Sequence, residues 1–241
     1  MRSPRSSCCS VVELRQYTTH PGRRDVLVEL FDRELVEPQE AHGMHVVGQF
    51  RDLDRPDMFV WLRGFPDMET RGNALAGFYG GPVWKQHRDA ANATMADSDN
   101  VLLLRPASPG AGLTHQGLDR TAPATDTPAE SRVEVTVCPL EAPAGDDLLA
   151  DLRLRALPAL DGALGRTVAC YVTEPAENNF PALPVRPDNV LVWISRPDNA
   201  SGPRGTHAPD LTTEVLPTLE KYLDGPPQTM RLSPTPRSQL R

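Results

Sequence analysis

The stretch MFVWLRGFPD, residues 58–67, decides the fold, because it alternates like a strand yet places Arg63 on the same side as Trp61. A related phrase, VLVWISRPDN, returns at residues 190–199, where Ser195 stands in place of the arginine. The two phrases predict that one structural unit occurs twice in the chain. They also predict that only the first copy keeps a polar pocket.

The pattern around each phrase predicts the element order β-α-β-β-α-β, which is the ferredoxin-like arrangement. Alternation indicates the strands and a helical period indicates the helices, with Pro38 expected to end one helix and Pro82 to begin another. The predicted strands are residues 11–17, 44–50, 58–65 and 100–106, followed by 132–138, 166–172, 189–195 and 228–234. The predicted helices are residues 23–38, 70–96, 146–160 and 211–223, the second of them broken at GFYGGP.

Shared landmarks support an internal duplication. In each copy a glutamate of the first strand is followed by a glycine, after 30 positions in the first copy and 31 in the second. A tryptophan follows that glycine after 18 and 28 positions, because the second copy has a longer loop, EPAENNFPALPVRPD. The landmarks are Glu13, Gly43 and Trp61, and then Glu134, Gly165 and Trp193.

The predicted fold class is therefore α+β, with two tandem ferredoxin-like halves that form a barrel of the dimeric α/β type. A ferredoxin-like sheet covers one face with its helices, so its open face must be buried by another sheet, from the same chain or from a second copy. We expect a disordered tail over residues 1–10, a first domain over 11–107, a flexible linker over 108–131 and a second, diverged domain over 132–241. The linker is rich in Pro, Gly, Ala, Ser and Thr and shows no apolar period.

Composition excludes several classes of partner. The net charge is −7 and no basic stretch is long enough to follow a phosphate backbone, so nucleic acid is not expected. No apolar run has the length of a membrane span, and no secretory signal is visible at the start. The four cysteines form no CxxC motif, with Cys8 and Cys9 in the predicted tail, which favours a reduced cytoplasmic protein without a disulfide framework or a zinc site.

Strand alternation also predicts a pocket. Val12 and Leu14 share an apolar side, which we expect to lie under the helices, so the opposite polar side is expected to face the barrel interior. The polar and aromatic side chains that would converge there are Glu13, Arg15, Tyr17, His45, Gln49, Phe59, Trp61 and Arg63, with Trp84 as a further apolar wall. The alternative is that this side faces solvent, or that Glu13 forms an ion pair with Arg63 or Arg15.

The phrases VVELRQYTTHPG, FVWLRGFPDMETR, FYGGPVWKQHRDAANATM and RLSPTPRS resemble the NIPSNAP family, most densely over residues 11–106. That family belongs to the dimeric α/β-barrel superfamily, so the resemblance implies a closed barrel and a possible homodimer. The wider superfamily includes cofactor-free monooxygenases, isomerases, haem-degrading enzymes and proteins with no settled activity. The resemblance therefore fixes the expected fold more closely than the chemistry.

The side chains suggest a small-molecule enzyme without a bound cofactor, such as an oxygenase, isomerase or cyclase of secondary metabolism. His45 would remove a proton, and Arg15 and Arg63 would stabilise the resulting anion. Glu13, Tyr17, Gln49, Phe59, Trp61 and Trp84 would bind the substrate.

Two alternatives remain open from the sequence. One is a ligand-binding or interaction protein without catalysis, and the other is a haem-binding enzyme that uses His87 as an axial ligand. A metal site at Glu40, His42 and His45 is not expected, because the two imidazoles should diverge where the chain turns into a strand.

Overall fold

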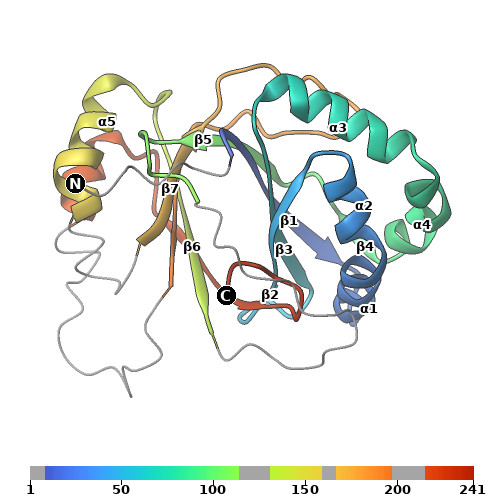
Figure 1. The fold of residues 1–241 in the computed structure, drawn as a ribbon. Helices are drawn as coiled ribbons and strands as arrows, with labels where there is room; N and C mark the ends of the chain where they lie inside the picture. Colours follow the sequence, from blue (N-terminus) through green and yellow to red (C-terminus); the bar gives the residue numbers. More distant parts are fainter. Residues whose placement is uncertain (1–8, 114–130, 159–166, 197–214) are drawn as a thin grey trace.

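The computed structural model describes residues 9–113, 131–158, 167–196 and 215–241 (Figure 1). Their strands form one antiparallel sheet in the order β3-β2-β9-β6-β8-β7-β5-β1-β4, and an additional pairing of β3 with β1 closes it. The closed part is an eight-stranded barrel within the described chain, and β4 extends it at β1. The barrel therefore closes within one chain.

The N-terminal segment follows the predicted order except at the end of the predicted helix 70–96, where the helix stops at Asn92 and a short strand, β4, follows. Its elements are β1 (Val11–Thr19), α1 (Arg24–Leu30), η1 (Phe31–Leu35), α2 (Val36–Ala41), β2 (His45–Asp52), β3 (Met58–Phe65), α3 (Met68–Gly80), α4 (Pro82–Asn92), β4 (Met95–Asp97) and β5 (Val101–Pro106). Asp67 caps α3 by accepting a hydrogen bond from the backbone N–H of Thr70, and Pro82 begins α4 as predicted. Pro38 does not end the first helix, since it lies in the first turn of α2, where its missing N–H costs little.

The C-terminal segment repeats this order in shorter elements. They are β6 (Val133–Pro139), α5 (Asp146–Asp151), η2 (Leu152–Ala156), β7 (Thr167–Thr173), β8 (Val190–Ser195), α8 (Leu216–Leu219), η3 (Glu220–Tyr222) and β9 (Gln228–Pro234). The ends of the predicted helices 146–160 and 211–223 extend into residues outside the described ranges. In both segments the first helix contains a π-helical stretch, η1 in one and η2 in the other.

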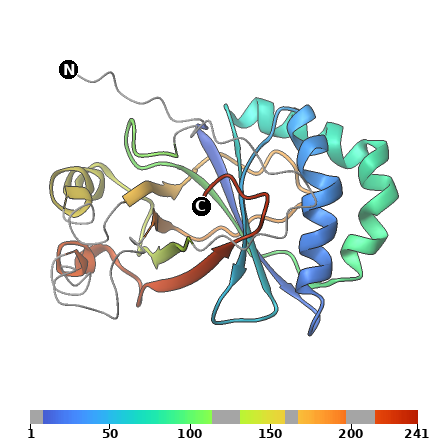
Figure 2. The same cartoon turned by 60° about the horizontal axis from the view of Figure 1, so that its bottom comes forward.

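The two segments share one strand order and one register. The order is β2-β3-β1-β5 in the first and β7-β8-β6-β9 in the second, and pairings β2–β9 and β5–β7 join them. Glu13 lies opposite Arg63, just as Glu134 lies opposite Ser195. Figure 2 shows the helices of the two segments on opposite sides, with the strands between them.

The barrel interior is filled by apolar side chains. Val12 and Leu14 point into it, together with Val60, Leu62 and residues from every strand of the C-terminal segment, including Val133, Val135, Tyr171, Val192, Ile194, Met230 and Leu232. The expectation that Val12 and Leu14 lie under the helices is therefore wrong. An eight-stranded barrel is just wide enough for side chains to fill it, so its interior takes the more uniformly apolar face of each strand.

Parts of the predicted tail and linker are packed. Cys9 is buried against the barrel core rather than loose, and Ser10 donates a backbone hydrogen bond to Phe65. Leu113, inside the predicted linker, is also buried and donates its N–H to the hydroxyl of Tyr171 at 2.8 Å. The rest of the predicted linker, residues 114–130, lies outside the described residues.

The last residues of the chain hold the N-terminal segment. Arg237 donates to the backbone oxygen of Asp32 and to the carboxylate of Glu37, both in the first helix of that segment. The N–H of Leu240 donates to the backbone oxygen of Val47 at 3.0 Å, and its side chain joins the barrel core. This end of the chain therefore packs across both β2 and the first helix.

We predict that Leu240→Ala lowers the free energy of unfolding by about 2–5 kcal/mol, because it removes a buried side chain from a filled core. Leu154→Ala is the matched control, since that side chain is 67 % exposed and its loss should change stability by less than about 0.5 kcal/mol. Urea unfolding followed by circular dichroism measures both. Equally small changes in the free energy of unfolding for both variants would show that Leu240 does not stabilise the barrel core.

Candidate functional site

The polar side of the first strands lies under the helices and not in the barrel. The helix-side core of the N-terminal segment includes Tyr17, Phe59 and Trp61, packed against Leu27, Phe31, Leu35, Leu75 and Phe78 of the helices. The expectation that this side lines the barrel interior is wrong. Alternation shows which residues share a side, and in this protein both sides are buried.

Glu13 is the centre of a buried ionic cluster. Its carboxylate accepts hydrogen bonds from Arg15 Nη1 at 2.6 Å, Arg63 Nε at 2.8 Å and Arg71 Nε at 2.7 Å. The four side chains are at most 1 % exposed. Both ion pairs that the sequence offered as an alternative, with Arg63 and with Arg15, are confirmed, and the helix α3 adds a third.

The cluster keeps Glu13 ionised. Burial alone would raise the pKa of Glu13, but the three guanidinium groups, Arg63 first, outweigh it and hold the pKa well below its ordinary value. For Arg71 the balance is reversed, since burial lowers its pKa more than the carboxylate raises it. Burial also raises the pKa of Tyr17 above its ordinary value, so its hydroxyl stays protonated near neutral pH.

Two tyrosine hydroxyls connect this cluster to a cavity. Tyr17 accepts a hydrogen bond from Arg15 Nε at 2.8 Å, and Tyr79 accepts one from Arg63 Nη1 at 3.3 Å. Both guanidinium groups also lie over the ring of Trp61, at 5.4 and 5.0 Å from its centroid. Arg15 and Arg63 therefore pack against aromatic side chains that line the cavity.

The cavity lies between the sheet and the helices of the N-terminal segment and measures about 40 Å³. Its lining combines aromatic and aliphatic side chains with a few polar groups: Tyr17, Leu27, Phe31, Leu35, Gln39, Trp61, Phe78, Tyr79, Trp84, Ala91 and Met95. That volume holds a water molecule or two, so a larger ligand requires the wall to move. The helix α4 forms part of this wall, and Ala91 is the only buried side chain along it.

His45 is not part of this site. Its ring Nδ1 lies 3.6 Å from the sulfur of Cys9, and its Nε2 lies 2.7 Å from Oε1 of Gln239, on the far side of the sheet from Arg63. A bulge in β2 between Val46 and Gly48 separates it from Gln49, which faces the helices. The predicted convergence of His45 with the arginines is therefore not seen.

The remaining predicted residues divide between lining and support. Trp84 lines the cavity, whereas Phe59 does not line it and packs against Phe31 with ring centroids 5.4 Å apart.

Gln49 is fully buried, and both the nitrogen and the oxygen of its amide lack a hydrogen-bond partner among the described residues. His87 does not line the cavity, and its Nε2 lies 3.7 Å from a carboxylate oxygen of Glu34. The haem-binding alternative stays a prediction. Within the described ranges no three His, Cys, Asp or Glu side chains gather as a metal site.

Sequence reasoning missed Arg71 and the residues that hold it. Arg71 Nη1 donates to Oδ1 of Asn178 at 3.1 Å and of Asn179 at 2.7 Å. A signal for Arg71 was present, because Ala74, Leu75 and Phe78 follow it at helical spacing on the buried face of α3. No comparable signal marks the two asparagines, which lie more than a hundred residues further along the chain.

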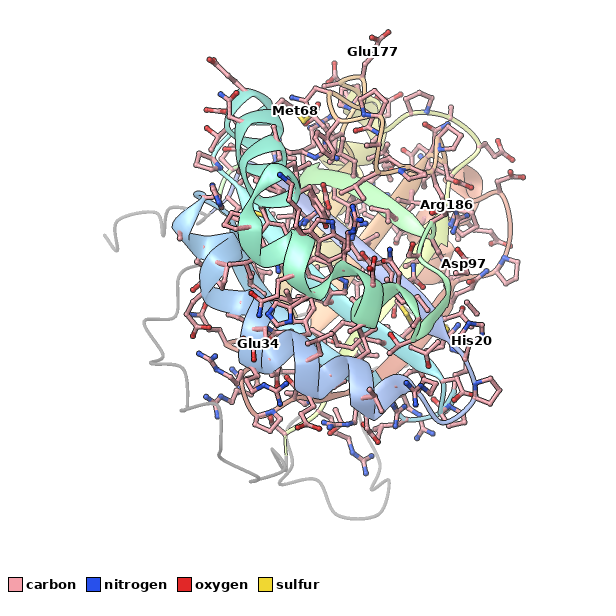
Figure 3. The ribbon with its side chains drawn as sticks, turned by 90° about the vertical axis from the view of Figure 1, so that its right-hand side faces the viewer. His20, Glu34, Met68, Asp97, Glu177 and Arg186 are labelled. Atoms are coloured by element: carbon pink, nitrogen blue, oxygen red, sulfur yellow. The ribbon has the colours of Figure 1, made fainter. Side chains whose placement is uncertain are left out.

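The asparagines belong to the lengthened loop of the C-terminal segment, residues 174–188, which we call the strap. The strap runs from β7 across to α3 (Figure 1, orange), and Figure 3 shows its Glu177 at the same end of the molecule as Met68, the first residue of that helix. Phe180 stacks on the ring of Tyr79, with centroids 5.9 Å apart and planes at 28°. The C-terminal segment thus contributes part of the wall around the N-terminal site.

Among the described residues, the equivalent face of the C-terminal segment carries no such cluster. Thr136 and Ser195 occupy the positions of Arg15 and Arg63 in the shared register. The helix-side core there is apolar, built from Cys138, Leu148, Leu152, Cys170, Leu191, Trp193 and Leu219. Burial raises the pKa of both Cys138 and Cys170 to about 12, so neither thiol ionises at neutral pH.

The fold and this site define a barrel of the dimeric α/β class, closed within one chain. Residues 12–109 match the NIPSNAP family model, so the chain contains a NIPSNAP domain. A "putative monooxygenase" from Lactobacillus acidophilus NCFM is similar over 95 % of this chain and 96 % of its own, with TM-score 0.55 and 9 % identity. Another so described, from Fusobacterium nucleatum, is similar over 93 % and 91 %, with TM-score 0.54 and 9 % identity.

A third structure extends the likeness over almost the whole chain. It is described as an anthrone oxidase-like protein and is similar over 98 % of this chain and 96 % of its own, with TM-score 0.50 and 14 % identity. A comparison with curated proteins found no significant match. None of the helices in the described residues has the length and apolar character that a membrane crossing needs.

We predict that Glu13→Gln lowers the free energy of unfolding at pH 7 by about 3–5 kcal/mol, because it leaves three buried guanidinium groups without a counter-charge. Glu134→Gln is the matched control, at the equivalent position of β6 but only half-buried and opposite Ser195. Chemical denaturation of both variants checks this. A loss no larger for Glu13 than for Glu134 would contradict the role of the cluster.

The pH dependence of the same variant follows from the lowered pKa of Glu13. Because the folded pKa lies below the unfolded value of about 4.3, ionised Glu13 stabilises the fold above that value. This contribution is lost as the pH falls through the folded pKa. The stability difference between wild type and Glu13→Gln should therefore be complete at pH 7 and shrink below about pH 4.

We further predict that Asn178→Ala detaches the strap from α3. Asn178 accepts from Arg71 and from the N–H of Phe180, and it donates to the backbone oxygen of Leu183 at 2.8 Å, so its loss should cost about 1.5–3 kcal/mol. Faster limited proteolysis within the strap is the expected result. Asn73→Ala, exposed on α3, is the control and should leave the cleavage rate unchanged.

Proposed function

We propose that the chain is a NIPSNAP-type small-molecule enzyme that works without a tightly bound organic cofactor. Its site would be the helix-side cavity of the N-terminal segment, and its substrate would be a planar aromatic compound. The observation that carries the proposal is the aromatic cavity whose two tyrosine hydroxyls are backed by Arg15 and Arg63. The overall likeness to two structures described as monooxygenases supports an oxygenase in preference to other reactions of this fold.

The arrangement suits the stabilisation of an oxygen anion. A guanidinium group that donates to a tyrosine oxygen makes the remaining hydroxyl proton a stronger donor to a ligand. In a site without water, such donors stabilise charge that develops during reaction. Tyr17 and Tyr79 would make the direct contact, so Arg15 and Arg63 act through them rather than on the substrate itself.

An anthrone is a concrete substrate for this chemistry, suggested by the third similar structure. Loss of a proton from its methylene carbon gives an enolate, whose oxygen would accept hydrogen bonds from the two hydroxyls. The enolate can then pass electrons to O₂, and the net reaction converts anthrone and O₂ into anthraquinone and water. Among the described residues no carboxylate or imidazole lines the cavity, so we infer that the proton passes to solvent water and that the positive cluster favours this transfer by stabilising the enolate. We assign no part in this step to His45.

The arrangement of the chain as two tandem halves is also a proposal. We infer that the shared strand order, the matched register and the two π-helical stretches come from tandem ferredoxin-like halves. The boundaries expected at residues 11–107 and 132–241 follow from this inference. The cytoplasmic location and the homodimer predicted from the sequence remain predictions.

The test is oxygen consumption by the purified protein with 1,8-dihydroxyanthrone and no added cofactor. We expect turnover above the uncatalysed rate, and a loss of about 10²–10³-fold in kcat in Tyr17→Phe, because one donor to the developing anion is removed. Tyr222→Phe, far from the cavity in η3, is the control and should keep the wild-type rate.

The outcomes separate the candidate functions. Absence of turnover together with binding of the anthrone would favour a ligand-binding protein without catalysis, the second candidate for this cavity. Turnover that is equal in wild type and Tyr17→Phe would place the reaction elsewhere.

A further inference from the structure

The buried cluster carries more positive than negative charge. Three guanidinium groups meet one carboxylate, so the formal charge of the cluster is +2. The other acceptors that these arginines reach are all neutral: the hydroxyls of Tyr17 and Tyr79, the amide oxygens of Gln39, Asn178 and Asn179, and the sulfur of Met44. The strap therefore binds Arg71 without neutralising it, although an acidic residue, Glu177, is next in sequence and remains exposed.

Such an excess is unusual inside a protein. Buried charges are normally paired, because removing an ion from water costs far more than a neutral contact returns. In this cluster two nitrogen atoms, Nη2 of Arg63 and Nη2 of Arg71, are buried and have no hydrogen-bond partner among the described residues. An anion brought close to the cluster would therefore gain strong attraction at little further cost.

The cavity offers a place where that anion can bind once the wall moves, since its present volume is about 40 Å³. Tyr17 and Tyr79 both line it, and each uses its oxygen to accept from an arginine. Neither hydroxyl donates to another described residue, so each proton is available to a ligand. The rest of the lining is aromatic or aliphatic apart from Gln39, whose side-chain nitrogen donates to the backbone oxygen of Leu35.

We propose that this cavity binds aromatic oxyanions, carboxylates or phenolates, in preference to neutral compounds of the same shape. The anionic oxygen accepts hydrogen bonds from Tyr17 and Tyr79, and the cluster around Glu13 supplies the opposing charge. This inference rests on the proposed function only in using the same cavity, and it deepens it by naming the charge state of the ligand. It does not depend on any reaction with oxygen.

The test compares 2-naphthoate with 2-naphthamide by isothermal titration calorimetry on the full chain. The two compounds have nearly the same shape but differ in charge, so we expect naphthoate to bind at least about tenfold more tightly. Tyr79→Phe removes one donor from a part-exposed residue and should weaken naphthoate binding by about tenfold or more. Tyr222→Phe should leave it unchanged. Equal affinities for the two compounds, no binding of either, or no effect of Tyr79→Phe would overturn the proposal.

Glu13→Gln provides a readout with the opposite sign. Removing the carboxylate raises the formal charge of the cluster from +2 to +3, so the variant should bind naphthoate more tightly although it is less stable. Naphthoate should then raise its melting temperature more than that of the wild type, because a ligand of the folded state stabilises it by mass action. A smaller shift than in the wild type would contradict the charge argument.

The two proposals can fail separately. Preference for naphthoate without anthrone turnover would leave the anion site intact and remove the proposed reaction. Anthrone turnover without any preference for naphthoate would support the proposed reaction and overturn the anion site.

Discussion

The carboxylate of Glu13 is the contact on which the N-terminal site depends. Through Arg63 it joins β1 to β3, and through Arg71 it fixes the helix α3 above them. Because Arg71 also binds two asparagines of the strap, the same carboxylate couples the C-terminal segment to the site. One buried acid thus holds together two strands, one helix and a loop from more than a hundred residues away.

The packed barrel interior favours the helix side as the place of the candidate site. The interior is closed by strands of both segments and filled with apolar side chains, so it forms a core shared by both segments. The two helix-side faces remain, and they differ in the side chains that they carry. The face at Glu13 keeps an ionic cluster and an aromatic cavity, whereas the face at Glu134 is packed with apolar residues around Trp193.

Much of this could be predicted from the sequence, and the failures have physical causes. The strands, the break at Pro82 and the pairing of Glu13 with Arg63 and Arg15 follow from local pattern and cross-strand geometry. The side that faces the barrel could not be decided by polarity, since ion pairing lets a polar face be buried as completely as an apolar one. The bulge beside Val46 then moved His45 to the wrong side of the sheet for the predicted site, and no residue pattern in β2 announces it. The strap was correctly expected as a lengthened loop, but its contact with Arg71 is a long-range contact that local pattern cannot reveal.

A barrel closed within one chain permits an asymmetry that two identical subunits cannot have. In a symmetric pair every strap and every cluster would occur twice, so a loop could not lengthen over one site without lengthening over the other. In this chain the C-terminal segment has Thr136 and Ser195 where the site has arginines, yet it supplies Asn178 and Phe180 to that site. Its neutral amides hold Arg71 in place while leaving the charge of the cluster uncompensated. A covalent connection between two unlike segments therefore permits the C-terminal segment to support the N-terminal site without carrying an equivalent cluster itself.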